Sequence, residues 1–176
     1  MRLQMPMDVM MRDTEELLGR SGPAGWWCSS CGELITSIED GWVEWLVGGE
    51  DEKGASTISG LHLVHRDRGS TGRCCRYDPR QEFAEHLSIV EGLPLARFVG
   101  PDGLMLLLLF LASGEMPKQE VLELAKRVQI PGYEQSRELL RNMIEQGLFS
   151  ASMAEGFYLQ SEIQTVLQWA LRTEVA

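Results

Sequence analysis

The residues best suited to chemistry are four cysteines and one histidine, all between positions 28 and 75. Cys28 and Cys31 are separated by two residues and followed by Gly32, the spacing of a thiolate pair on a tight turn. Glycine lets the chain leave such a turn without a Cβ clash. Two sulfurs presented in this way can bind one ion, so the sequence predicts a metal site, with zinc as the expected metal.

The other ligands must come from a second part of the chain. His65 ends a predicted strand, and two adjacent cysteines follow it in a turn bounded by glycine. The predicted ligands are Cys28, Cys31, His65 and Cys74, with Cys75 as the alternative fourth ligand. All four cysteines without the histidine form a rival set, which is harder to build because adjacent side chains point in different directions.

Four protein ligands would close the coordination sphere, so the predicted zinc is structural. A catalytic zinc would need an open position and a nearby general base. The sequence has no His-Glu-x-x-His motif, no phosphate-binding loop and no nucleophile elbow. We therefore expect a protein that is not an enzyme, and a zinc-dependent enzyme is the weakest of three functional hypotheses.

Composition limits the other functions. The 176 residues are 44% hydrophobic and 24% charged, which is typical of a soluble globular protein. A net charge of −10 disfavours nucleic acid as a partner, because affinity for phosphates comes largely from Lys and Arg. No secretion signal is visible, so a reducing cytoplasm is expected. The apolar run 104–112 is too short for a membrane span of about 20 residues.

Local patterns predict an α+β chain, with a small β-rich unit followed by a mainly helical domain. Strands are expected at 42–47 and 61–65, and a helix opened by Asp78 and Pro79 at 79–91. Periodicity predicts further helices at 103–113, 117–128, 133–146 and from 161 onward, with a hairpin at 148–159. The predicted divisions are a tail or short helix at 1–25, the metal unit at 26–78, a helix and connector at 79–100, and a helical domain at 101–176.

Residues 26–78 resemble the zinc-ribbon class, in which two short turns are joined by one ion with a β-hairpin between them. The Cys28–Cys31 pair carries this resemblance, whereas the second pair of ligands is irregular.

The order helix, helix, turn, helix and hairpin in residues 103–160 resembles a winged helix-turn-helix domain. The segment 142–149 is similar to that family's passage from recognition helix to wing. The resemblance implies that helix 133–146 could contact DNA or a partner. The candidate contact residues are Gln135, Ser136, Arg137 and Arg141. Glu134 and Glu138 would oppose phosphates, and the expected wing has no Lys or Arg at 150–155.

These observations favour a non-enzymatic zinc-binding adaptor or regulator that docks onto proteins, including those of a nucleic-acid-associated complex. The alternative is a transcriptional regulator that reads DNA with helix 133–146. Because helix 103–113 is apolar all round, another surface should cover it. Self-association through 104–111 is therefore a further hypothesis.

Overall fold

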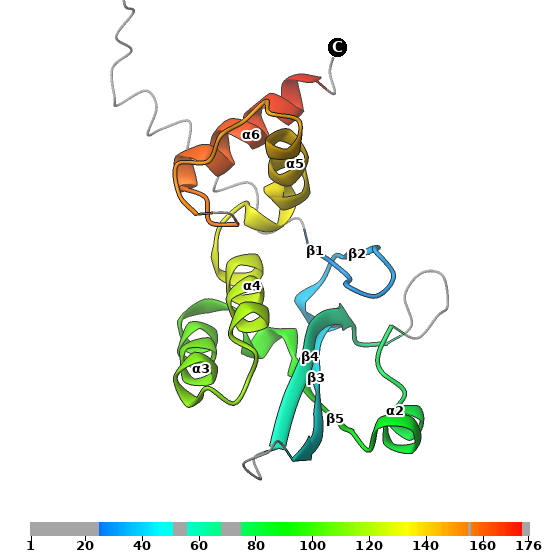
Figure 1. Ribbon diagram of the computed structural model, residues 1–176. Coiled ribbons are helices and arrows are strands. Elements are labelled where there is room, and N and C mark those ends of the chain that lie inside the picture. The colour runs from blue at the N-terminus through cyan, green and yellow to red at the C-terminus, as the bar shows by residue number, and fades with distance from the viewer. Residues whose placement is uncertain (1–24, 51–55, 68–74, 155, 174–176) are drawn as a thin grey trace, which may run out of the picture.

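The computed structural model describes residues 25–50, 56–67, 75–154 and 156–173 (Figure 1). It confirms the α+β class, with small antiparallel sheets in the first half and helices in the second. The helix expected within the first 25 residues lies outside the described residues. In the part of the chain that is described, no helix is both long and apolar enough to cross a membrane.

The strands form two antiparallel sheets. A minimal two-stranded sheet pairs β1 with β2, and a three-stranded sheet has the order β4-β3-β5. Their bounds are Trp26–Trp27 for β1, Leu34–Ile35 for β2, Gly41–Glu50 for β3, Ser56–His65 for β4 and Ile89–Pro94 for β5. Short 3-10 helices cover Ile38–Asp40 (η1) and Leu95–Arg97 (η2).

The β3–β4 hairpin confirms both predicted strands and extends them. Gly41 pairs with His65 at one end, and the register shifts twice, between Glu44 and Leu46 and between Val47 and Glu50. Alternating residues of β3 face opposite sides of the sheet, so both sides of this apolar strand need cover.

Strand β5 was not predicted. It pairs along the other edge of β3, with Trp42 opposite Pro94 and Val47 opposite Ile89. The segment 93–101 was expected to be a connector and a domain boundary. Instead its first residues complete the sheet, and Leu95 and Phe98 are fully buried in the core that follows.

Helix α2 (Pro79–His86) begins where the sequence indicated. The Asp78 carboxylate accepts hydrogen bonds from the N–H groups of Arg80 and Gln81, as an N-cap does. The helix ends earlier than predicted, at Leu87, which adopts a left-handed φ of 54°. Its apolar side chains Phe83 and Leu87 are exposed to solvent.

The remaining helices are α3 (Gly100–Ser113), α4 (Lys118–Gln129), α5 (Tyr133–Glu145) and α6 (Gln160–Thr173). Helices α3 and α4 pack against the three-stranded sheet; Trp45 meets Phe110 edge to face at 5.8 Å. One apolar core runs from Trp26 to Val128. This core is therefore continuous across the boundary predicted at residue 100.

Helices α5 and α6 pack on each other around a smaller core (Figure 1). Its buried residues are Tyr133, Leu140, Ile163 and Val166. The predicted wing hairpin is wrong: the described residues of 148–159, all but Glu155, contain no strand. Phe149 and Tyr158 pack onto the α5–α6 core instead. The N–H groups of Leu148 and Phe149 bond back to the Met143 carbonyl.

Helix α3 is only partly covered. Leu107 is buried, but Met105 and Leu109 are 66% and 61% exposed, and Leu104 and Leu108 are exposed as well. The described residues thus leave one side of an apolar helix in solvent.

Candidate metal centre

Four side chains from three segments of the chain converge on one point. They are Cys28, Cys31, His65 and Cys75. One ligand atom from each lies within 4.8 Å of all the others. The Nδ1 atom of His65 is 3.6 Å from the Cys31 sulfur and 3.7 Å from the Cys75 sulfur. Ligand atoms around a tetrahedral zinc are about 3.5–3.8 Å apart, given bonds of about 2.0–2.3 Å. The residues therefore fit a tetrahedral ion.

The first two ligands sit on a tight turn between β1 and β2. The Gly32 N–H bonds to the Cys28 carbonyl at 3.0 Å, and Gly32 takes the positive φ of 73° that glycine tolerates. The Ser29 N–H bonds to the Leu63 carbonyl at 2.8 Å, which holds the turn beside β4. This backbone bond holds the turn against the end of β4 that carries His65, and it does not depend on a bound ion.

Two of the thiols respond in opposite ways to this environment. Burial would raise the pKa of Cys28, but backbone hydrogen bonds from Cys31, Ser30 and His65 outweigh it and lower that pKa to about 6. Burial and contacts with the other two thiols raise the pKa of Cys75 to about 12. Three thiolates cannot share so small a volume without a cation, whereas a bound divalent ion would deprotonate its thiol ligands.

Among the described residues, the fourth member of the cluster is Cys75, the alternative of the two adjacent cysteines. Cys75 is 3% exposed and lies in the cluster. Cys74, the first choice from the sequence, lies outside the described residues. The described cysteines Cys28, Cys31 and Cys75 form no disulfide.

A buried carboxylate fixes the segment that carries Cys75. Glu44 is fully buried at the middle of β3, and its Oε1 accepts the Tyr77 N–H at 2.7 Å. The same carboxylate accepts hydrogen bonds from His62 Nε2 at 3.0 Å and Arg76 Nε at 3.1 Å. Burial would raise the pKa of Glu44, but these partners, His62 foremost, lower it overall. Glu44 therefore positions the segment that carries Cys75. His62 is bonded to Glu44 and lies outside the metal cluster.

A buried ion pair connects the Cys28–Cys31 turn, called the metal turn below, to the α4–α5 junction. Arg127 and Glu134 are 6% and 3% exposed and form a two-bond ion pair, with N–O distances of 2.8 and 2.7 Å. Arg127 also donates to Ser29 Oγ at 3.0 Å and to the Trp27 carbonyl, and Glu134 accepts the Trp27 N–H at 2.7 Å. Both residues flanking Cys28 are thus tied to the helices.

Neither buried group was predicted as a functional residue, although each leaves a trace in the sequence. Glu44 interrupts the apolar strand Trp-Val-Glu-Trp-Leu-Val, and Arg127, three residues after Leu124, borders the apolar side of a periodic helix. A charge inside an apolar pattern indicates a buried partner.

The predicted contact residues of α5 do not form an open surface. Ser136 is fully buried, and its hydroxyl donates to the Tyr133 carbonyl. Arg137 lies within 4.0 Å of carboxylates of Glu123, Glu134 and Glu138. Gln135 donates to the Gly25 carbonyl at 3.3 Å, while Arg141 is exposed and pairs with Glu138.

Compared with known protein families, with curated proteins and with solved structures, the chain matches none of them. The function must therefore be inferred from the site and the surfaces themselves.

Proposed function

We propose that this chain is a non-enzymatic zinc protein whose helical and sheet surfaces dock onto another protein. The observation that carries the proposal is the complete ligand set. Three sulfurs and one nitrogen supply all four positions of a tetrahedral site, and thiolate-rich tetrahedral sites favour Zn²⁺. A site without a free position holds structure in place and does not activate water.

The ion would hold together three segments of the chain that are far apart in the sequence. Its ligands join the turn after β1, the end of β4 and the segment before α2. Binding free energy at such a site is folding free energy. A reducing cytoplasm would keep the thiols available for the metal, which supports that compartment.

Docking is supported by the apolar surface of α3. Monomeric proteins rarely expose large contiguous apolar patches, and such patches commonly mark interaction sites. Leu104, Met105, Leu108 and Leu109 form its exposed part. In this proposal the partner is a different protein, since a charge of −10 on each copy opposes close approach of two copies. Self-association through 104–111 is the alternative.

The contact residues of α5 give less support to DNA binding. Ser136 is buried and Arg137 is surrounded by carboxylates, which would repel phosphates. The proposal therefore does not include recognition of DNA by this helix.

The test combines metal analysis with affinity capture. Purified full-length protein should contain one zinc per chain. Tagged protein in its native host should capture a reproducible partner, and Leu109→Asp should abolish the capture while Leu171→Asp on exposed α6 should not. Capture of no specific protein, or a concentration-dependent dimer in light scattering that Leu109→Asp abolishes, would overturn the docking proposal in its present form.

A further inference from the structure

Strand β5 forms an uncovered edge of the three-stranded sheet. The strand order is β4-β3-β5, so both β4 and β5 are edges. The edge of β4 is occupied, because Glu120 accepts the Leu61 N–H and Ser29 donates to the Leu63 carbonyl. Among the described residues, no backbone hydrogen bond reaches β5 from any element other than β3. Its outer N–H and C=O groups are therefore free to pair.

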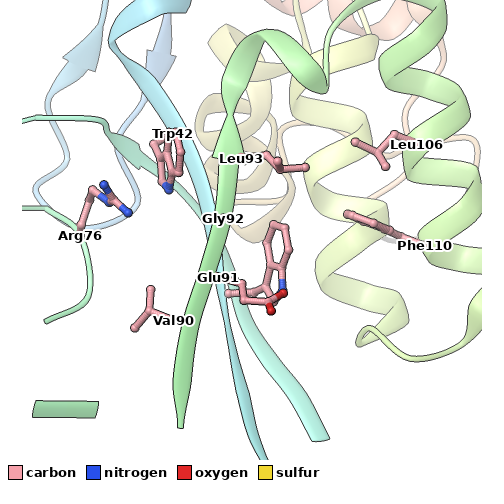
Figure 2. A pocket seen from close by; sticks show the side chains of 9 residues that line it. Trp42, Arg76, Val90, Glu91, Gly92, Leu93, Leu106 and Phe110 are labelled. Carbon is pink, nitrogen blue, oxygen red and sulfur yellow. The ribbon is translucent and has the colours of Figure 1, made fainter. Parts of the chain in front are cut away.

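A hollow of about 530 Å³ follows this edge on both sides of the strand. Figure 2 shows Trp42, Arg76 and Val90 on one side of β5, and Leu93, Leu106 and Phe110 on the other. Gly92 lies between them, and a Cβ there would be 2.4 Å from Trp42 Nε1. Residues from both faces of the sheet therefore line the hollow, and Trp42 lies directly over Gly92.

This shape fits an extended peptide better than a helix or a small molecule. Successive side chains of a strand point to opposite faces, so a peptide paired with β5 would send alternate side chains into the two halves of the hollow. Backbone pairing supplies affinity in such complexes, and the pockets for alternate side chains supply specificity.

Charge specifies the peptide further. Arg76 is already paired with the buried Glu44 and lies over the Trp42 ring at 4.6 Å. Glu91, at the centre of β5, is exposed, and no described residue forms an ion pair or hydrogen bond with it. A Lys or Arg of the peptide would complement Glu91 and the net charge of −10.

We propose that the edge of β5 binds an extended segment of a partner protein that carries Lys or Arg opposite Glu91. A large apolar side chain two positions away would lie against Leu93 and Phe110, on the same face. This inference rests on the proposed docking function and adds a second contact surface, the β5 edge, to the exposed side of α3.

The experiment uses the zinc-loaded full-length chain and phage-displayed random heptapeptides. Enriched sequences should alternate in polarity and carry Lys or Arg two positions from a large apolar residue. A synthetic peptide of the enriched sequence should slow amide exchange in 89–93. Glu91→Lys should weaken its binding by about two- to thirtyfold, since cross-strand attraction is exchanged for repulsion.

Matched controls separate charge complementarity from a general change in charge. Glu145→Lys, the same substitution at an exposed position of α5, should leave peptide affinity unchanged. A peptide with Glu in place of its Lys should regain affinity for the Glu91→Lys variant.

Three results would overturn the proposal: no enriched peptide, enrichment of acidic or helical amphipathic sequences, or protection of α3 without β5. A dimer whose β5 amides are protected without peptide would assign the edge to a second copy of the chain. If partner capture in the host succeeds while these tests fail, the docking function of α3 stands and only the assignment of the β5 edge is wrong.

Discussion

The region from β1 to α4 and the α5–α6 pair are stabilised by different means. The first has a continuous core of apolar residues around a sheet, a buried carboxylate and a cluster of four side chains that could bind a metal ion. The second has four buried core residues, and Glu134 anchors it to the first region. The metal turn is the point where the two meet, because Arg127 contacts both Ser29 and Glu134.

This difference indicates a hierarchy. In the proposed function the sheet region requires a bound ion. The α5–α6 pair requires the sheet region, since its charged anchor would otherwise be a costly buried pair. Loss of the metal should therefore affect both regions, whereas loss of the anchor should affect mainly the second.

The largest expected effect follows from removing a metal ligand. Cys31→Ser should lose zinc and unfold the sheet region, because apparent zinc binding at such sites contributes about 10–16 kcal/mol. Metal content and far-ultraviolet circular dichroism would measure this. Cys74→Ser is the matched control and should keep its zinc. If Cys31→Ser kept a native spectrum but lost an activity, the cluster would be a reactive centre.

The second effect concerns the anchor between the two regions. Arg127→Met should cost about 3–5 kcal/mol of unfolding free energy, because Glu134 would remain buried without its main partner. Urea unfolding would give the loss, and hydrogen exchange should increase most in α5 and α6. The double variant Arg127→Met with Glu134→Gln should recover part of it. Equal exchange increases in both regions would contradict the hierarchy.

The third effect is pH-dependent and lies in the sheet region. The pKa of Glu44 is lowered in the fold from 4.5, so its stabilisation is fully present above about that pH and is lost as the pH falls through the lowered value. Glu44→Gln should cost about 1–3 kcal/mol at pH 7 and flatten the acid side of the stability curve. Urea titrations from pH 3 to 7 would measure this. The exposed Glu85→Gln should leave the curve unchanged.

The smallest effect on stability is expected at the surface of α3. Met105→Asp should change unfolding free energy by only about 0.5 kcal/mol, because the side chain is 66% exposed. The same variant should lose the captured partner. A large loss of stability would mean that this face is covered in the folded chain and is not a docking surface.

The parts of this fold that depend on local patterns were predictable from the sequence. The Cys28–Cys31 turn, the β3–β4 hairpin and the helix start at Asp78 each follow from neighbouring residues. So does the approach of His65 to the cysteine pair, since it ends the second strand of a hairpin.

The rest depends on contacts between distant segments. β5 contains Gly92 and Pro94, which weaken a strand pattern, and only pairing with β3 makes it a strand. The position of Cys75 in the cluster depends on such a contact, since Glu44 of β3 accepts the N–H of Tyr77, two residues after it. The expected wing does not form because Phe149 and Tyr158 pack against the core between α5 and α6. Their burial therefore needs no β-hairpin.

The position of β5 also has a consequence for synthesis. β3 lies between β4 and β5, so its second edge stays bare until residue 94 has left the ribosome. At about 5–20 residues per second, the interval between the end of β3 and the end of β5 lasts roughly 2–9 seconds. During that time the nascent hairpin presents an unpaired apolar edge that contains Trp42, Val43 and Trp45. Unpaired edges of this kind promote aggregation, so the newborn chain should depend on a chaperone most strongly in those seconds.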